Sequence, residues 1–272
     1  MIDTLILSAC GMKGIYYIGV FKSLLEKNII QRDNIKNILC CSSGCLFGLL
    51  FLLGYSLEFI EKIVISIDFE KLFNYDDLID LFSDNGLFEI NKFMKIFKNI
   101  LIHKGFNEYI TFKELYENTD INYVLKVYNY TDKKDEYISY INHPDLSVIK
   151  AISMSCSIPI IFKTIQYKNK IYIDGGITGS TPIINDTRYN NFICIKLKNK
   201  KFYNKSNETI YTYIMNIFEI GKEKTHIINK NNITVTCCKG IRISDFSLKE
   251  CDKIDMINYA KLCTDIHIDR FL

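Results

Sequence analysis

Residues 35–53 constrain the fold more than any other part of the chain. An apolar run ending at Leu39 predicts a short buried strand, and residues 46–53 predict a buried helix. Only small residues, Cys-Cys-Ser-Ser-Gly, occupy the turn between them at residues 40–44. A tight turn from strand to helix lifts a serine hydroxyl above the sheet and places it at the positive end of the helix. We therefore interpret Ser42, at the centre of this turn, as a candidate nucleophile.

Buried strands alternate with helices along the rest of the chain. We expect strands at residues 4–8, 35–39, 122–130, 136–140, 164–167, 170–173, 191–197 and 233–237. We expect helices at residues 15–27, 46–53, 147–155, 209–220 and 249–263, and a mostly helical stretch at residues 58–117. The last helix of that stretch begins at a capping box, Thr111-x-x-Glu114. This order predicts an α/β fold of packed layers, with a parallel centre to its sheet.

Length and composition limit the classes of function. The 272 residues suit a single domain, residues 1–272, and an apolar content of 48% with 24% charged residues predicts a globular protein. The net charge of +3 is too small to predict a nucleic-acid partner. Lysines cluster at Lys196, Lys198, Lys200, Lys201 and Lys205. Such a run either meets an anionic membrane surface or, more often, forms a solvated loop.

The cysteines and the start of the chain favour a reducing, cytoplasmic environment. Several of the ten cysteines lie in apolar or turn contexts, and no Cys-x-x-Cys pair suggests a zinc site. The chain opens on a strand-like run rather than on a signal peptide. Residues 37–57 carry no charge, but their lipophilic part is only about a dozen residues long, which is typical of a core helix. We therefore expect no signal peptide and no transmembrane helix.

The turn at residues 9–14, Ala-Cys-Gly-Met-Lys-Gly, lies between the first expected strand and the first expected helix. Its backbone N–H groups can converge on an anion, either a phosphate or the oxyanion of a tetrahedral intermediate. A dinucleotide-binding loop is the competing interpretation. However, the turn has one glycine too few, and the second strand ends in Cys40-Cys41-Ser42 instead of an acidic residue. The oxyanion role therefore fits better beside Ser42.

Asp174 ends an apolar run and is followed by two glycines, so its carboxylate is expected at a strand end with backbone packed closely around it. A turn aspartate that closes a hairpin is the alternative for an isolated Asp-Gly-Gly. A serine nucleophile needs a base, and a Ser–Asp–His order with His226 or His267 stays open. Direct proton transfer from Ser42 to Asp174 is the simpler hypothesis, because neither histidine lies in the loop context expected of such a base.

Taken together, these three motifs resemble those of the patatin-like phospholipase family. Residues 9–14 are similar to the family's Gly-Gly-Gly-x-Arg/Lys-Gly, residues 40–44 to its Gly-x-Ser-x-Gly, and residues 174–176 to its Asp-Gly-Gly/Ala. Residues 151–162 are similar to its Ala-Ile-x-Ala-Ser-x-Ala-Ile-Pro-x-x-Phe stretch. The resemblance covers residues 5–182 and implies a three-layer α/β/α fold with a mostly parallel central sheet, which residues 183–272 complete.

For the site, the resemblance implies a carboxylic ester hydrolase of phospholipase A type, with a Ser–Asp dyad and neither metal nor cofactor. Ser42 attacks the acyl carbonyl, Asp174 accepts its proton, and water then cleaves the acyl-enzyme. The backbone N–H groups of Cys10, Gly11 and Met12 hold the oxyanion. The other motif residues have supporting roles: Lys13, Gly14, Cys40, Gly44, Gly175 and Gly176.

The implied substrate is lipid in a membrane or micelle, so peripheral membrane contact is expected, and the need for an activating partner stays open. An apolar stripe in residues 209–220 is a candidate lid or membrane face, although such a stripe is also typical of a core helix. Ala9 and Cys10 replace motif glycines, which matters where the backbone needs a positive φ. Cys40 replaces a third motif glycine, and its added bulk is expected to strain the turn. The alternative function is a catalytically weak or inactive patatin-fold protein that binds lipid or membrane.

Overall fold

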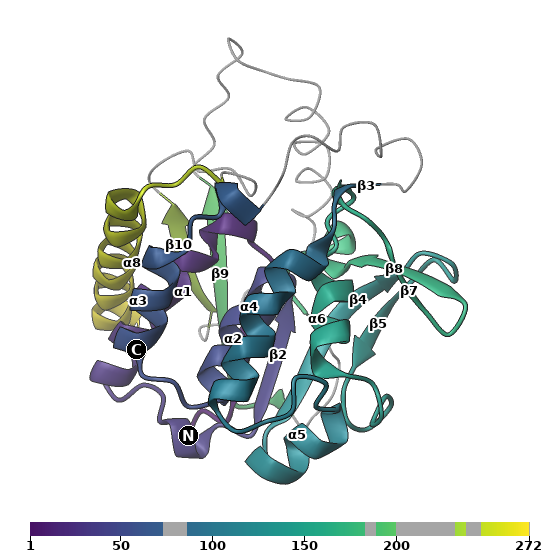
Figure 1. Ribbon diagram of the computed structural model, residues 1–272. Coiled ribbons are helices and arrows are strands. Elements are labelled where there is room, and N and C mark those ends of the chain that lie inside the picture. The colour runs from purple at the N-terminus through teal and green to yellow at the C-terminus, as the bar shows by residue number, and fades with distance from the viewer. Residues whose placement is uncertain (73–85, 183–188, 200–231, 238–245, 272) are drawn as a thin grey trace.

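The computed structural model describes residues 1–72, 86–182, 189–199, 232–237 and 246–271. Within these residues, a mostly parallel sheet of eight strands forms the centre of the molecule, in the order β10-β9-β1-β2-β4-β8-β7 with β5 also paired to β4 (Figure 1). Its strands are β1 (Thr4–Leu7), β2 (Asn37–Cys41), β4 (Asn122–Asn129), β5 (Lys134–Ile138), β7 (Ile165–Tyr167), β8 (Lys170–Asp174), β9 (Phe192–Asn199) and β10 (Asn232–Cys237). Strands β3 (Gly86–Phe88) and β6 (Ile160–Phe162) form a separate parallel pair.

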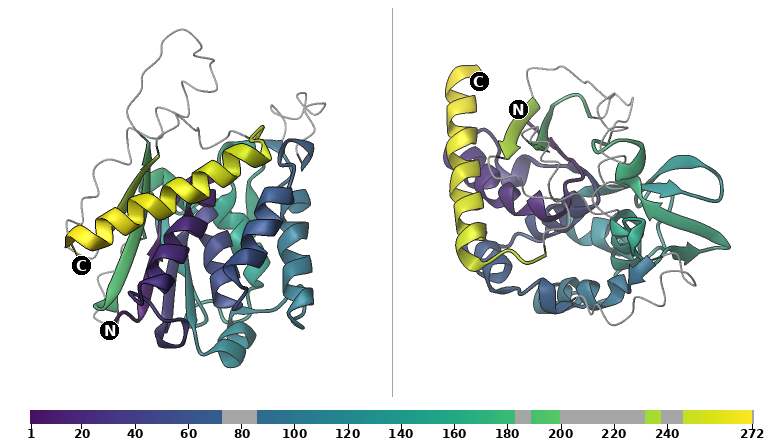
Figure 2. Two further views of the ribbon diagram at one scale, coloured as in Figure 1. Left: turned by 90° about the vertical axis from the view of Figure 1, so that its left-hand side faces the viewer. Right: turned by 90° about the horizontal axis from the view of Figure 1, so that it is seen from above.

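Helices pack against this sheet and against one another. The α-helices are α1 (Tyr16–Glu26), α2 (Ser43–Leu52), α3 (Leu57–Ser66), α4 (Ile90–His103), α5 (Phe112–Thr119), α6 (Val148–Cys156) and α8 (Glu250–Phe271). The 3-10 helices are η1 (Gly11–Ile15), η2 (Arg32–Asn34), η3 (Glu70–Leu72) and η5 (Gly175–Thr178). Helix α2 packs on β2 and α6 on β4 and β8, while α8 lies along the outside of α1 (Figures 1 and 2).

The central strands are buried on both faces, as the alternation of their side chains shows. In β1, Leu5 and Leu7 belong to the large core beneath the helices, whereas Ile6 belongs to a smaller cluster on the opposite face. The smaller cluster also contains Leu39, Val124, Cys194 and Tyr189. Continuous apolar strands of this kind are typical of parallel sheets covered on both sides. The α/β class and the parallel centre expected from the sequence are confirmed.

Strand β4 has three partners, and its register decides which of them share an edge. Strand β5 pairs along residues 125–129 of β4, β2 pairs along residues 122–126, and β8 pairs along residues 127–129. A strand has only two edges available for pairing. Because β5 overlaps both other stretches, it occupies one edge alone, and β2 and β8 follow each other along the second edge.

The two strands on that shared edge run in opposite directions and end at neighbouring positions. The last residue of β2, Cys41, lies opposite Lys126, and the last residue of β8, Asp174, lies opposite Val127. The first residue after β2 is Ser42. The sheet topology thus brings Ser42 and Asp174 together, although 132 positions separate them in the sequence.

Most expected elements are confirmed with small changes in their ends. The capping box of Thr111 and Glu114 begins α5, and the hairpin of β7 and β8 turns at Lys168 and Asn169, which both have positive φ. Helix α8 continues to Phe271, beyond the expected end at residue 263. Strands β3 and β6 were not expected, because three-residue strands leave little alternation to detect. The expected helix at residues 209–220 lies outside the described residues.

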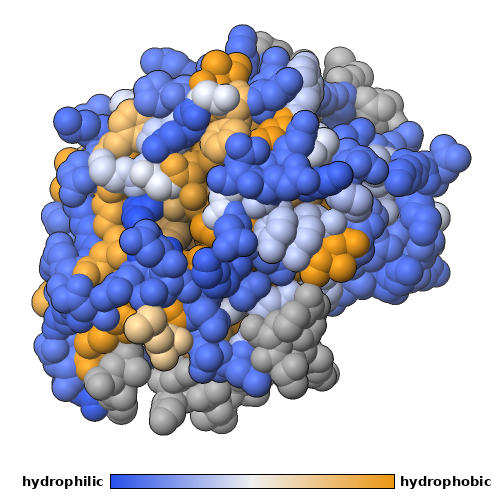
Figure 3. Space-filling model, turned by 90° about the horizontal axis from the view of Figure 1, so that it is seen from below, coloured by the Kyte–Doolittle hydropathy of each residue, from blue (hydrophilic) through white to orange (hydrophobic). Residues whose placement is uncertain are grey.

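The uncharged stretch at residues 37–57 divides into β2 and the buried helix α2, which confirms its interpretation as core. In the described parts of the chain, no helix combines the length and apolar character that crossing a membrane requires. At the end of the molecule seen from below, hydrophilic residues form much of the surface, with hydrophobic residues in patches between them (Figure 3).

Candidate active site

The turn after β2 holds Ser42 in a backbone conformation that few non-glycine residues adopt. Its φ of 52° and ψ of −130° turn the chain sharply from strand into helix α2. Gly44 makes the turn possible, because a Cβ atom there would lie 2.7 Å from the carbonyl oxygen of Leu7. Cys40 fits without a positive φ, and its thiol donates to the carbonyl of Val124 at 3.6 Å. The substitution of Cys40 for glycine therefore leaves the turn intact.

Helix α6 fixes this turn through a serine whose contribution the sequence did not reveal. The backbone N–H of Ser42 donates to Ser155 Oγ at 2.9 Å, and Ser155 Oγ donates to the carbonyl of Lys126 at 2.7 Å. All three groups are buried. Ser155 belongs to the stretch at residues 151–162 that resembles the family, so a signal was present without an assigned role. It links the turn, helix α6 and strand β4.

Asp174 receives hydrogen bonds on both carboxyl oxygens. Ser42 Oγ donates to Oδ2 at 2.5 Å, and the backbone N–H of Gly176 donates to Oδ1 at 2.6 Å. The backbone N–H of Asp174 donates to the carbonyl of Ser157 at 2.9 Å. Ser42 and Asp174 are 3% and 4% exposed, so their contact is shielded from water. Gly175 is required beside them, because a Cβ atom there would lie 2.5 Å from the Lys126 carbonyl oxygen.

The loop at residues 9–14 lies beside the turn that carries Ser42. Gly11, which the sequence retains, has a φ of 57°, whereas neither Ala9 nor Cys10 has a positive φ. The two substitutions thus fall where the backbone does not need glycine. Gly14 packs closely against α2, because a Cβ atom there would lie 2.6 Å from the ring of Phe47. Lys13 is buried in η1.

One of the three expected oxyanion donors has another partner in this structure. The backbone N–H of Cys10 donates to Ser43 Oγ at 3.3 Å. For the N–H groups of Gly11, Met12 and Ser43, no acceptor is found among the residues that the structure describes. These three residues and Ser42 line the same cavity. Three backbone N–H groups without an acceptor among these residues therefore belong to the cavity lining beside Ser42, at the start of two helices.

The cavity at Ser42 is strongly apolar. The space beside Ser42 measures about 830 Å³ with its opening to solvent included, and its lining comes mainly from α2 and α4, with further residues from η1 and α3. Aromatic side chains contribute much of the lining: Phe47, Phe69, Phe93, Phe97, Phe162 and Phe246. Such a lining suits a hydrocarbon chain, whose burial contributes about 0.8 kcal/mol per methylene group. Helix α4 contributes Phe93, Ile96, Phe97 and Ile100 to the lining, and the sequence predicts only a mostly helical stretch for this region.

The histidines that the structure describes lie elsewhere. No histidine of the described residues lines the cavity. His103, at the end of α4, is hydrogen-bonded through Nδ1 to the hydroxyl of Tyr55 at 2.9 Å. His267 lies in α8, where burial lowers its pKa, and burial also lowers the pKa of His143. His226 lies outside the described residues.

Buried cysteines lie around the turn. Burial raises the pKa of both Cys45 and Cys156 well above the usual value. Because the thiolate is the nucleophilic form, these groups are poor nucleophiles near neutral pH. No disulfide joins the eight cysteines whose side chains the structure describes. In the same parts of the chain, no group of three or more His, Cys, Asp or Glu side chains is arranged to hold a metal ion.

Residues 5–185 match the family model described as patatin-like phospholipase. The "Probable lipid hydrolase 463L" of Invertebrate iridescent virus 6 is 31% identical over 225 residues, which span 82% of this chain and 73% of that protein. The "Uncharacterized protein YqhO" of Bacillus subtilis is 24% identical, and the match spans 98% of each chain.

Solved structures of low sequence identity share the fold. VipD from Legionella pneumophila superposes with a TM-score of 0.68 at 16% identity, over 99% of this chain and 67% of that one. The type III effector ExoU superposes with a TM-score of 0.55 at 13% identity, over 98% of this chain and 53% of that one. This chain thus spans about half the length of the ExoU chain.

Proposed function

The chain belongs to the patatin-like phospholipase family, and we propose that it is a serine lipid acyl hydrolase. Its substrates are acyl esters of phospholipids or related lipids, and its catalytic pair is Ser42 and Asp174. One observation carries the proposal: Ser42 Oγ donates to Asp174 Oδ2 at 2.5 Å, at the wall of an apolar cavity. A nucleophile, its base and space for an acyl chain therefore lie together.

The reaction begins when Ser42 Oγ attacks the carbonyl carbon of the ester and its proton passes to Asp174 Oδ2. The carbonyl oxygen becomes an oxyanion, which the N–H groups of Gly11, Met12 and Ser43 stabilise at the positive ends of η1 and α2. The tetrahedral intermediate then expels the alcohol part of the lipid, which takes the proton from Asp174. Ser42 remains acylated.

Water completes the cycle by the same route. Asp174 takes a proton from a water molecule, whose oxygen attacks the acyl carbonyl, and the second oxyanion forms in the same place. Its collapse releases the fatty acid and returns the proton to Ser42 Oγ. The hydrogen bond from Gly176 N–H keeps Oδ1 occupied, so Oδ2 remains the oxygen that faces Ser42.

The apolar lining and the shielded dyad favour a lipid over a small polar ester. An acyl chain along α3 and α4 replaces water in the cavity, while the polar part of the lipid stays outside. A substrate held in a membrane or micelle requires the protein to bind that surface peripherally. Residues 209–220, the expected lid or membrane face, lie outside the described residues.

Fatty-acid release from phospholipid vesicles tests the proposal with the wild type, Ser42→Ala and Asp174→Asn. We expect release by the wild type alone, with kcat reduced by about a thousandfold or more in each variant. Circular dichroism and thermal unfolding check that the variants fold. Release that survives Ser42→Ala excludes this mechanism. Vesicle binding by all three proteins without release, even in the presence of cell extract as a source of activators, favours the alternative of a lipid-binding protein.

The same assay tests for a histidine base. His267→Ala and His226→Ala are expected to keep wild-type turnover, because proton transfer between Ser42 and Asp174 is direct. A loss comparable to that of Asp174→Asn in either variant, with folding retained, replaces the dyad by a triad.

A further inference from the structure

A buried lysine lies behind the catalytic pair and takes no part in the chemistry above. Lys126 is 3% exposed, at the position of β4 opposite Cys41. Its Nζ donates to the carbonyl of Gly179 at 3.0 Å and to Thr178 Oγ1 at 3.1 Å, and forms an ion pair with Asp135 Oδ2 at 3.2 Å. A buried ammonium group is stable only when such partners surround it.

These partners fix the segment that follows Asp174. Residues 175–178 form η5, whose first turn donates the Gly176 N–H to Asp174 Oδ1. Lys126 holds the other end of the same 3-10 helix at Thr178 and Gly179. Asp135 strengthens this hold, because its Oδ1 accepts a hydrogen bond from Thr178 Oγ1. The 3-10 helix that orients the Asp174 carboxylate is thus attached to β4 at its far end.

The same segment also reaches the loop that carries the oxyanion donors. Gly179 has a φ of 142°, a conformation available to glycine, and the chain then turns so that the carbonyl of Ser180 accepts a hydrogen bond from the N–H of Ala9 at 2.7 Å. Ala9 is the first residue of the loop that contains Gly11 and Met12. Residues 174–180 therefore connect the base to the oxyanion donors, and Lys126 holds the middle of this connection.

The backbone carbonyl of Lys126 also supports the turn that carries Ser42. Its carbonyl accepts from Ser155 Oγ, which in turn accepts from the N–H of Ser42. Gly175 lies directly on this carbonyl. One residue of β4 thus contacts the supports of both the nucleophile and the base.

We propose that Lys126 is a positioning residue for the hydrolysis: its side chain, with Asp135 and Thr178, holds residues 174–180 so that the Asp174 carboxylate and the oxyanion donors are aligned with Ser42. This inference rests on the proposed function. It assigns Lys126 no contact with the substrate. Misplacing catalytic groups by about 1 Å lowers rates by about a hundredfold. The loss of these contacts is therefore expected to lower kcat even in a variant that remains folded.

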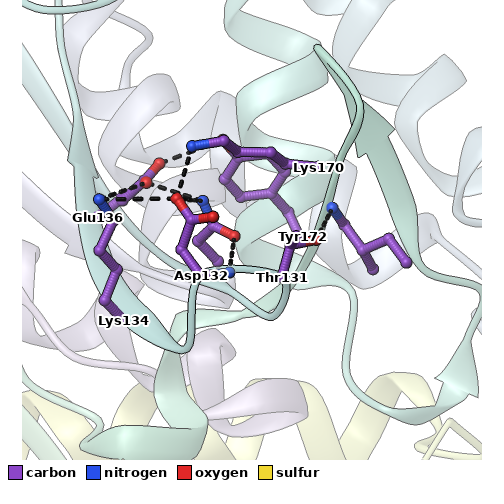
Figure 4. Close-up of polar contacts among 8 residues, drawn as sticks. Thr131, Asp132, Lys134, Glu136, Lys170 and Tyr172 are labelled. Carbon is purple, nitrogen blue, oxygen red and sulfur yellow. Dashed lines mark hydrogen bonds and ion pairs between the residues drawn. The ribbon is translucent and has the colours of Figure 1, made fainter.

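A second polar network, on the hairpin of β4 and β5, supplies a matched control. Lys170 is paired with Asp132 at 2.5 Å, and Lys134 lies between Asp132 and Glu136 (Figure 4). Along β5, Asp135 points to the opposite face from its neighbours Lys134 and Glu136, because side chains alternate on a strand. The network in Figure 4 therefore braces the start of β8 without contacting residues 175–180.

The test is the rate at which a fluorophosphonate probe labels Ser42, together with kcat and KM for a soluble butyryl ester. We expect Lys126→Met to lower the labelling rate and kcat about 10- to 100-fold with KM nearly unchanged. Lys126→Arg, which keeps the charge and donors, is expected to recover most of the rate. Lys170→Met removes a lysine from the control network and is expected to stay within about twofold of the wild type.

The outcomes separate this inference from the proposed function. No labelling of the wild type, or labelling that persists in Ser42→Ala, contradicts the proposed function itself. Labelling of folded Lys126→Met at the wild-type rate overturns the positioning role, even if its melting temperature falls. If Lys126→Met does not fold, Asp135→Asn and Thr178→Val decide: a slower rate in both supports the role, and wild-type rates overturn it.

Discussion

The two residues of the proposed catalytic pair are held in place by different means. Ser42 lies in a turn that its immediate neighbours build, since a strand, a close-packed glycine and a helix follow one another without interruption. Asp174 ends a strand whose position depends on distant segments: Val127 beside it, Ser157 at its N–H, and Lys126 behind η5. The turn at Ser42 is therefore built mainly by adjacent residues, with contacts to the β1 backbone and to Ser155, whereas the position of Asp174 depends on contacts across the tertiary structure.

This difference predicts where substitutions act. Around Ser42, we expect the largest effects from changes within the turn and in Ser155, which accepts the hydrogen bond from the Ser42 N–H. Around Asp174, damage can come from residues far away in sequence that leave the strand intact. The predictions below challenge this contrast, beginning with the largest expected effect.

Gly44→Val should break the turn itself. A Cβ atom at this position meets the carbonyl oxygens of Leu7 and Ser8 at 2.7 and 2.9 Å, and both belong to backbone that cannot move freely. We expect a loss of about 3 kcal/mol or more in the free energy of unfolding, and no measurable turnover. Denaturant unfolding and vesicle hydrolysis measure the two effects.

Gly54→Val is the control for that substitution. Gly54 has a φ of 66°, but nothing lies within 4 Å of its added Cβ atom, so only backbone strain is expected. Near-normal turnover in Gly54→Val beside its loss in Gly44→Val locates the effect in the turn. Equal losses in the two variants would contradict the importance of the close approach at Gly44.

Ser155→Ala should loosen the nucleophile without removing it. The variant leaves the N–H of Ser42 without its acceptor and the carbonyl of Lys126 without this donor, both in buried positions. We expect about 1–3 kcal/mol of lost stability and about a tenfold lower kcat. The matched variant Ser153→Ala removes a hydroxyl that bonds only within α6, to the carbonyl of Ile149, and should leave kcat nearly unchanged.

Ile96→Trp should change substrate preference rather than the chemistry. Ile96 lines the cavity from α4, so a larger side chain shortens the space for an acyl chain while Ser42 and Asp174 stay in place. We expect about a fivefold loss on palmitoyl esters and none on butyryl esters. Ile102→Trp, at an exposed position of the same helix, should affect neither substrate. Equal losses on both esters would place the acyl chain outside this cavity.

The smallest expected effect concerns thiol reactivity. Burial keeps the pKa of Cys45 and Cys156 well above the usual value, so both stay protonated at about pH 8, where thiolates of ordinary pKa begin to form. Cys251 is exposed. Iodoacetamide followed by mass spectrometry should therefore modify Cys251 first and leave turnover unchanged. Early modification of Cys156, which lines the cavity, would show that the site opens more than its packing indicates.

The sequence indicates candidate site residues where the signal lies in neighbouring residues. Ser42 was found from the small residues around it, and the loop at residues 9–14 from its position between a strand and a helix. The two glycines after Asp174 likewise marked a strand end with close packing. Each of these signals lies within a few residues of the group that it predicts.

The contributions of other residues were hidden because they depend on contacts across the fold. Nothing near Cys10 in the sequence indicates that its N–H is taken by Ser43 Oγ, 33 positions away. Nothing in the sequence distinguishes Lys126 from the other lysines. Its position in β4, opposite the last residue of β2 and next to the residue opposite Asp174, sets it apart. The cavity wall formed by α3 and α4 is similarly a result of packing, although the apolar face of α4 can be recognised in the sequence.

By itself, the sequence determined the order of strands and helices and the conformation of the turn at Ser42. The physical reason is that backbone sterics and hydrophobic periodicity act over a few residues. Only the tertiary structure decided that Ser42 meets Asp174, because that contact depends on two strands of opposite direction sharing one edge of β4. The pairing of strands depends on the packing of the whole sheet, so it cannot be predicted from any short segment of the sequence.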